Sequence, residues 1–304
     1  MKKKIFAVCV MILIWMMCMG AGVIRTEQEP SGPGNKAELI MLPGTGAAQM
    51  LSAVIKTSEG SLIVIDGGWE ADGEPLGDLI VENGGRVKAW LLTHPHEDHV
   101  GALYHILRNR RDEIQIDKIY YSFAEPSWYR SVAPANPGMA EAMTEELAKL
   151  PEEMKMGSVG KGTVITVDDV VITALNDRYE LESDPVNNSS IVYRIDVKGK
   201  RVLFLGDLGY YGGIRLLEEC GAEELKADMV QMAHHGQNGV GQEVYQAISP
   251  SICLWPTPAW LWDNDGGNGP GSGPWKTLET RGWMQELNVE RNYCIKDGEI
   301  RLLL

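Results

Sequence analysis

Short apolar runs alternate with amphipathic segments along most of this chain. Strands are predicted at eight places, over residues 62–65, 90–93, 118–122, 170–175, 191–197, 202–205, 229–233 and 252–255. Helical spacing of apolar residues is found over residues 138–150 and 275–287, among other segments. Because groups of strands are followed by helices in both halves, the pattern predicts two sheets packed face to face with helices outside, a four-layer αββα sandwich.

The N-terminus has a different pattern. Three lysines at positions 2–4 precede a charge-free run over residues 5–24, and residues 25–36 are polar with several Pro and Gly. A basic start followed by an apolar run long enough to span a bilayer is typical of an export signal. We therefore expect a cleaved signal peptide or a membrane anchor over residues 1–24, a linker over 25–36 and one domain over 37–304. The protein would then be secreted or membrane-anchored, outside the cytoplasm.

Composition agrees with a single large domain. The chain has 304 residues, of which 44% are hydrophobic, so it can bury a sizeable core. Past residue 24 only Cys220, Cys253 and Cys294 remain. This odd and sparse set gives no disulfide framework, although one pair could form.

The chain is strongly acidic, with a formal net charge of −14 at pH 7. Without Lys2, Lys3 and Lys4 it has 25 basic and 42 acidic residues, a net charge of −17. Such a surface repels long polyanions. We therefore expect a small or short anionic substrate and no tight binding of duplex DNA.

Five of the six histidines fall in two short segments, residues 94–99 and 234–236. The first segment holds four side chains of the metal-ligand type: His94, His96, Asp98 and His99. It lies between a predicted strand and a predicted helix, of which Asp98 is the expected N-cap. Such a turn cannot wrap all four side chains around one ion. The first two ligands are therefore expected to bind one metal and the last two a neighbouring metal, as in two-metal hydrolytic centres.

The pattern of these residues resembles that of the metallo-β-lactamase superfamily. The chain contains the family's His-x-His-x-Asp-His signature at 94–99. The family's other motifs are present in the same order along the chain, with Asp66 before the signature and Asp207 and His234 after it. Asn187 and the residues after it resemble the extracytoplasmic domain of the DNA-uptake competence protein and its stand-alone relatives. The resemblance covers about residues 37–304. It implies the family's αββα sandwich and a hydrolase with two zinc ions, with manganese as an alternative.

The resemblance and the chemistry of the residues together predict their roles. Asp207 is expected to bridge the two metals, since a carboxylate has two oxygens. Asp66 would accept a hydrogen bond from a metal-bound histidine or water and fix its orientation. Comparing the two strand ends at His94 and His234 favours His234 as the last ligand, with His235 as a proton donor or a support for the site. Catalytic roles are thus expected for Asp66, Asp98 and His235.

The chain departs from the family where a third histidine usually completes the first site. It has Asn187 and Asn188 there, and Val186 is opposite that histidine if Ser190 anchors the comparison. An amide oxygen is a weaker ligand for zinc than imidazole is. The first site is therefore expected to bind zinc less tightly, or to admit more water or manganese. Asn187, Asn188 and His235 are each candidates for a contact with metal or substrate.

Two irregular segments, residues 123–137 and 255–267, are candidates for the substrate mouth. Each contains aromatic side chains that could stack on a base or a sugar, or could instead cover the sheet edges: Trp128, Tyr129, Trp260 and Trp262. With the competence branch as the nearest resemblance, a phosphodiester or nucleotide-like substrate is favoured. The alternatives are hydrolysis of a carboxylic ester, lactone or lactam, and a non-catalytic metal-dependent binding or sensory module.

Overall fold

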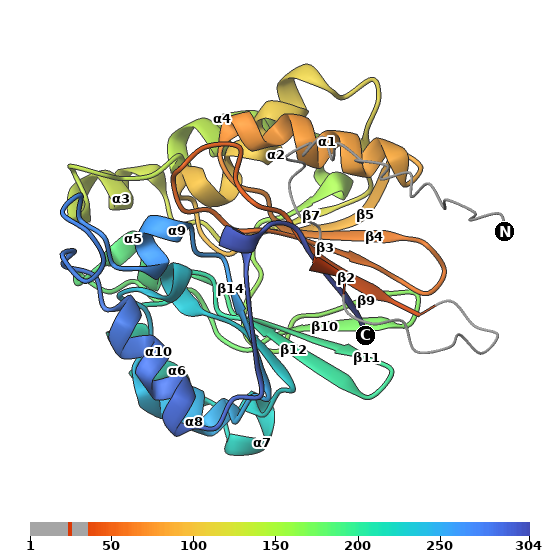
Figure 1. The fold of residues 1–304 in the computed structure, drawn as a ribbon. Coiled ribbons are helices and arrows are strands. Elements are labelled where there is room, and N and C mark those ends of the chain that lie inside the picture. The colour runs from red at the N-terminus through yellow and green to blue at the C-terminus, as the bar shows by residue number, and fades with distance from the viewer. Residues whose placement is uncertain (1–23, 26–35) are drawn as a thin grey trace, which may run out of the picture.

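The computed structural model describes residues 24–25 and 36–304 (Figure 1). Most of the predicted signal or anchor over residues 1–24, and of the linker over 25–36, lies outside the described residues. Of these segments, Ile24–Arg25 forms the short strand β1, which pairs in parallel with β16 (Ile300–Leu303). Within the described part of the chain, no helix is both long and apolar enough to cross a membrane.

The first sheet has nine strands in the described residues, in the order β1-β16-β2-β3-β4-β5-β7-β8, with β6 also paired to β5. An antiparallel set is followed by a parallel one that starts at β4 and β5. The strands not yet given are β2 (Glu38–Met41), β3 (Ser52–Lys56), β4 (Leu62–Asp66), β5 (Arg86–Leu91), β6 (Gln115–Ile116), β7 (Ile119–Tyr120) and β8 (Lys155–Met156).

The second sheet has seven strands in the order β15-β14-β13-β12-β11-β10-β9. Strands β12 to β15 are parallel, and β9 to β12 are antiparallel. Their bounds are β9 (Val164–Val167), β10 (Val170–Ala174), β11 (Tyr193–Val197), β12 (Lys200–Phe204), β13 (Met229–Gln231), β14 (Ile252–Trp255) and β15 (Arg291–Cys294).

Helices cover the outer faces of both sheets, as Figure 1 shows. On the first sheet these are α1 (Gly73–Glu82), α2 (Glu97–Asn109) and α4 (Ala140–Ala148). On the second sheet they are α6 (Tyr210–Glu219), α8 (Gln242–Ile248) and α10 (Thr277–Glu286). The remaining helices are short: α3 (Pro126–Val132), α5 (Pro185–Asn188), α7 (Ala222–Leu225) and α9 (Ala259–Trp262).

Three large apolar cores of the described residues follow from these layers, beside a small fourth cluster around Tyr129. Ile65 and Phe204 belong to the core between the two sheets, whereas Trp90 packs under the first helical layer and Trp255 under the second. In β4, Ile63 and Ile65 join the central core while the alternate residues join an outer core. A strand buried on both faces is continuously apolar, which is why β4 is easily recognised in the sequence. The predicted four-layer αββα sandwich is confirmed.

The prediction that Asp98 caps helix α2 is wrong. The helix begins at Glu97, and His96 occupies the N-cap position without a capping side-chain bond. Asp98 is the second helical residue, and its Oδ2 lies 3.1 Å from the Nε2 of His235. Its carboxylate therefore faces a histidine across the site.

Candidate metal centre

The carboxyl ends of strands from both sheets meet at one edge of the sandwich. Asp66 ends β4, and the segment 94–99 follows β5 in the same sheet. Asp207 and the pair His234–His235 follow β12 and β13 of the other sheet. The sheets touch here directly, since the amide of Ile191 donates to the carbonyl oxygen of Thr93. The fold therefore brings together side chains that lie far apart in the sequence.

Gly206 allows the close approach that places Asp207. It has a positive φ of 56°, and a Cβ at this position would lie 2.8 Å from the Cβ of Thr93. A larger residue would therefore push the two sheets apart at the site. The glycine before the aspartate is a structural requirement of the centre.

One group of ligand-type side chains consists of Asp98, His99, Asp207 and His235, whose donor atoms all lie within 4.8 Å of one another. Asp207 Oδ1 lies 3.2 Å from His99 Nε2, and its Oδ2 lies 3.2 Å from His235 Nε2. The two histidine nitrogens and Asp207 Oδ1 are buried without a hydrogen-bond partner. Such atoms require an explanation, and a shared cation supplies one.

The other group consists of His94, His96 and Asp207. His94 Nε2 lies 3.0 Å from His96 Nδ1 and 3.9 Å from Asp207 Oδ2. Burial lowers the pKa of His94 well below its usual value and that of His96 to about 4, so both rings are neutral at pH 7. Neutral imidazole is the metal-binding form.

Charge around Asp207 also favours a cation. Burial alone would raise the pKa of this carboxyl, but His235 and His99 hold it well below its usual value. Burial likewise disfavours charge on His235, yet Asp207 and Asp98 raise its pKa to about 9. The buried carboxylates therefore stabilise positive charge, which a divalent metal would provide in place of the protons.

Asp66 fixes the orientation of ligands in both groups. Its Oδ2 lies 2.7 Å from His99 Nδ1 and accepts a hydrogen bond from Thr93 Oγ1 at 2.7 Å. The Thr93 hydroxyl has a single proton, which it gives to Asp66, so it accepts from His94 Nδ1 at 3.1 Å. Protons on Nδ1 leave the Nε2 of both histidines free to bind metal. Asp66 thus lies next to the ligands, where the sequence comparison placed it.

The geometry favours His235 over His234 as a ligand, opposite to the preference drawn from the sequence. His234 is in neither ligand group, and its Nε2 lies 3.9 Å from Asp207 Oδ2. His235 is fully buried, and its Nδ1 contacts the carbonyl oxygen of Pro256 at 3.1 Å. Both histidines have left-handed backbone angles, with φ of 50° and 54°. This kink turns His235, the second histidine, into the site. Matching residues by their distance from the end of the strand cannot detect such a kink.

Of the two asparagines, only Asn187 faces the centre. Asn188 Oδ1 accepts hydrogen bonds from the amides of Gly209 and Gly212, and its Nδ2 donates to the carbonyl oxygen of Ser183. The prediction that Asn188 touches metal or substrate is therefore wrong, since its side chain holds the loop before α6. Val186 is buried against Tyr129 and also faces away.

The predicted aromatic substrate residues are not brought to the centre. Tyr129 is completely buried and donates to Ser189 Oγ at 3.1 Å, so its predicted substrate contact is wrong. Trp128 packs edge-to-face on Tyr129, and Trp262 packs edge-to-face on Trp255 in the outer core. Trp260 donates to the carbonyl oxygen of Ala47 at 2.6 Å and lines a separate cavity.

The cavity over the metal centre is small and polar. Its volume is about 190 Å³, and it is lined by Gln49, Trp69, His96, Glu97, Asp98, Asn136, Asn187, Asp207 and His234. Trp69 and Gln49 were not predicted from the sequence. The Trp69 indole donates a 2.8 Å hydrogen bond to the Gln49 carbonyl oxygen. Trp69 follows the Asp-Gly-Gly turn after β4, and that position was a signal that could have identified it.

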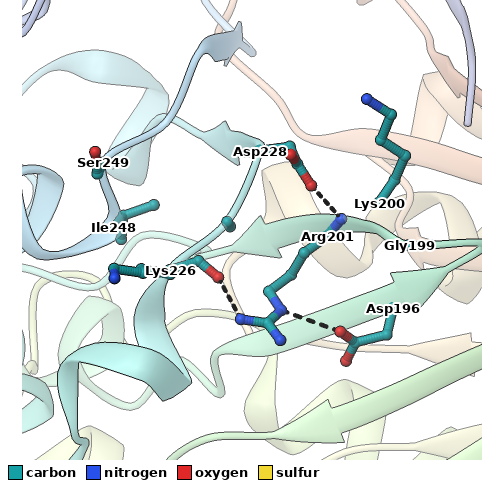
Figure 2. A pocket seen from close by; sticks show the side chains of 9 residues that line it. Asp196, Gly199, Lys200, Arg201, Lys226, Asp228, Ile248 and Ser249 are labelled. Atoms are coloured by element: carbon teal, nitrogen blue, oxygen red, sulfur yellow. Dashed lines mark hydrogen bonds and ion pairs between the residues drawn. The ribbon is translucent and has the colours of Figure 1, made fainter.

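A larger cavity of about 540 Å³ lies at the opposite ends of β12, β13 and β14 (Figure 2). Arg201 dominates it, but this guanidinium is bonded to Asp196 Oδ1 and to the carbonyl oxygens of Glu223 and Lys226. The arginine therefore acts as a structural clamp. A choice by cavity volume alone would therefore have selected this cavity and not the smaller one over the metal centre.

The residues present fit a pair of divalent metals. The two groups together contain four histidines and two carboxylates, and they share Asp207. They form a set of nitrogen and oxygen donors, with His96 at the cavity wall. Such donors suit zinc, manganese or iron. The orphaned donor atoms described above are those that the metals would bind.

Solved structures with the same fold come from proteins of low sequence identity. The metallo-beta-lactamase fold protein YhfI from Bacillus subtilis has a TM-score of 0.54 at 12% identity, covering 88% of this chain and 100% of that chain. CmlA, a diiron beta-hydroxylase from Streptomyces venezuelae, has a TM-score of 0.54 at 12% identity, covering 91% of this chain and 55% of that chain. These similarities support the fold.

Two curated relatives are named ribonuclease J. That of Thermus thermophilus is 36% identical over 90 residues, which is 27% of this chain and 16% of the relative. That of Corynebacterium glutamicum is 32% identical over 97 residues, covering 29% of this chain and 13% of the relative. The match thus spans less than a fifth of the length of each relative.

A family model described as the metallo-beta-lactamase superfamily matches residues 46–244, which is more than half of the chain and includes both ligand groups. The fold implies a divalent metal, in agreement with the donor set described above. The chain belongs to the metallo-beta-lactamase superfamily, whose members are generally hydrolytic enzymes.

Proposed function

We propose that this protein is a two-metal hydrolase of small or short anionic phosphodiesters or nucleotide-like substrates, working outside the cytoplasm. The observation that carries the proposal is the position of Asp207, which belongs to both ligand groups. Its two oxygens face different histidines of the four-residue group, and one of them also lies 3.9 Å from His94. A pair of metals held in this way would activate a water molecule and stabilise negative charge on the reacting oxygen.

The side chains of the cavity have distinct parts in this proposal. Asp66 keeps His94 and His99 in the tautomers that bind metal, through the bonds described above. His234 is 17% exposed and faces the cavity, where its ring can contact a substrate oxygen. Trp69 and Gln49 form part of the wall and would restrict the shape of the bound group.

The choice of a phosphodiester rests on two similarities. The resemblance of the motifs to the DNA-uptake competence branch favours it, and so does the local identity to proteins named ribonuclease J. A net charge of −14 opposes a long polyanion. The small cavity also favours a short substrate.

The location outside the cytoplasm rests on the sequence before residue 37. Lys2, Lys3 and Lys4 are followed by the charge-free run over residues 5–24. Fractionation of cells that produce the full chain would test this location. Recovery of the protein entirely in the cytoplasmic fraction would contradict it.

The test of the activity begins with metal analysis of protein purified without added metal. Turnover of bis-p-nitrophenyl phosphate, short oligonucleotides, a lactone and a lactam would then be measured with zinc and with manganese. Asp98→Ala and His99→Ala should abolish turnover of the accepted substrate without loss of fold, because they remove donors of the four-residue group. Asp117→Asn, at a surface ion pair with Arg86, is the matched control.

The outcomes separate the alternatives. Turnover of the lactone or lactam alone would favour the carboxylic ester, lactone or lactam hydrolase. Metal binding without turnover of any substrate would favour a binding or sensory module. Near wild-type turnover by Asp98→Ala or His99→Ala under limiting metal would show that the two-metal assignment is wrong.

A further inference from the structure

Asn187 presents a buried oxygen at the metal centre. Its side chain lines the cavity together with His96, Asp207 and His234, and the residue is only 4% exposed. The Oδ1 atom is buried and has no hydrogen-bond partner. A buried amide oxygen in this state lacks the partner that such atoms normally have.

The neighbours of Asn187 fix which way its amide points. Nδ2 lies 2.9 Å from Asp184 Oδ1 and 3.4 Å from His234 Nε2. The amide nitrogen faces Asp184 and donates to its Oδ1, because an amide nitrogen only donates and a carboxylate oxygen accepts. Oδ1 therefore points away from Asp184, on the side of the amide where no protein donor meets it.

The two ligand groups are unequal. One has four side chains, Asp98, His99, Asp207 and His235, whereas the other has only three, His94, His96 and Asp207. A metal in the three-residue group would therefore lack a protein donor that its neighbour has. Asn187 lines the same cavity as two of these three side chains.

We propose that Asn187 Oδ1 is the fourth protein donor of the His94–His96–Asp207 site and that Asp184 holds the amide in this orientation. The proposal rests on the two-metal centre of the proposed function, but it concerns only metal binding. An amide oxygen is a neutral and hard donor. The centre would then have one tight site and one weaker site that accepts manganese more readily than a site with three histidines.

The test is to titrate metal-stripped full-length protein with zinc and, separately, with manganese. Calorimetry and competition with a chelator measure the affinity of each binding step. Wild type should take up two metals in two steps of different affinity. Asn187→Ala should weaken the weaker step about tenfold or more and leave the tighter step unchanged. Asn187→His should raise the ratio of zinc to manganese affinity at the weaker step. Asn136→Ala, an exposed amide of the same cavity, should leave both affinities unchanged.

Asp184 is tested as a positioning residue. Asp184→Ala should weaken the same step by about tenfold. Asp184→Asn should restore much of this loss, because its amide oxygen still accepts the hydrogen bond from Asn187 Nδ2. A purely structural role would instead lower the thermal stability of both variants and change both binding steps together. Circular dichroism of each metal-free variant checks that the fold is retained.

The experiment distinguishes failure of the two-metal centre from failure of the role of Asn187. Uptake of one metal by wild type would overturn the two-metal centre itself. Uptake of two metals, with the weaker step of Asn187→Ala and Asn187→His within threefold of wild type, would overturn the role of Asn187 alone. Equal weakening of both steps in Asn187→Ala would also overturn it, because the amide would then support the whole centre.

Discussion

Asp66 Oδ2 lies 2.7 Å from His99 Nδ1, with both side chains completely buried. The same carboxylate reaches His94 through the hydroxyl of Thr93. One aspartate therefore fixes a histidine in each of the two ligand groups. Burial raises the pKa of Asp66, so these hydrogen bonds and the nearby histidine are needed to keep it charged.

We therefore expect Asp66→Asn to weaken binding at both metal sites by about 10- to 100-fold. The amide could place its nitrogen against His99 Nδ1, which would force this ring towards the wrong tautomer. Metal affinity measured by chelator competition checks the prediction, with Asp117→Asn as the control carboxylate. Weakening of a single site would show that the link through Thr93 does not orient His94.

The adjacent histidines should respond differently to truncation. His235 belongs to the four-residue ligand group and His234 to neither group, so only His235→Ala should remove metal-dependent stabilisation. A metal at 100 times its Kd stabilises a protein by about 2.7 kcal/mol, or a Tm shift of about 5 °C at this size. Thermal unfolding with and without metal measures the shift. Loss of the shift in His234→Ala, with the shift kept in His235→Ala, would reverse the assignment.

The sequence predicted the layers of the fold and eight of its strands, but not every strand of either sheet. Each of the eight predicted strands overlaps an observed strand, because strands such as β4 are apolar on both faces. Five strands of four or five residues were missed: β2, β3, β9, β15 and β16. β9 and β15 include exposed positions, and β2, β3 and β16 each contain a polar or charged residue within a short run. The length and burial of a short strand depend on the strands and helices packed against it, and the local sequence does not contain this information.

The same distinction applies to the site. Residues 94–99 were recognisable because their spacing is itself a ligand pattern. The choice between His234 and His235 depended on two left-handed residues in succession. Histidine is enriched at positive φ, but such residues are still uncommon, so a local pattern does not predict two in a row. The separate surroundings of Asn187 and Asn188 likewise depend on the fold. Asn187 is held by Asp184 of the same short turn, whereas Asn188 is held by the amide of Gly209, 21 residues further along the chain.

Trp69, and not Tyr129, should affect substrate binding. Tyr129→Phe removes hydrogen bonds to Ser189 and from the amide of Ala124, so it should lower the free energy of unfolding by about 1 kcal/mol and leave KM unchanged. Trp69→Ala removes part of the cavity wall and should raise KM. Urea denaturation and steady-state kinetics measure both effects. A raised KM in Tyr129→Phe at unchanged stability would instead favour a contact between Tyr129 and the substrate.

Stability should fall at alkaline pH because of a buried thiol. Burial raises the pKa of Cys253 from its ordinary value of 9.0 to about 12. The folded state therefore keeps a proton that the unfolded chain loses, so the stabilisation is complete below about pH 9 and is lost as the pH rises towards about 12. The expected slope for one thiol is about 1.4 kcal/mol per pH unit.

Urea unfolding of wild type and Cys253→Ala over this range checks the slope, which should be shallower in the variant. Cys294→Ala is a matched comparison, because burial also raises the pKa of that thiol to about 12. Parallel pH profiles for wild type and both variants would show that neither thiol stays protonated in the folded protein.

Binding of long duplex DNA should be weak at physiological salt. The chain carries a net charge of −14, and the basic residues at the cavity around Arg201 are neutralised in part, since Arg201 pairs with Asp196 and Lys226 pairs with Glu223. Because the net charge is strongly negative, binding should release few counterions from DNA, so the Kd should be weaker than about 10⁻⁴ M and should vary little with salt. Fluorescence anisotropy of a labelled duplex at two salt concentrations measures this, and a short single strand should still compete for turnover of bis-p-nitrophenyl phosphate. Nanomolar duplex binding with a steep salt dependence would overturn the preference for a short substrate and make DNA the first candidate.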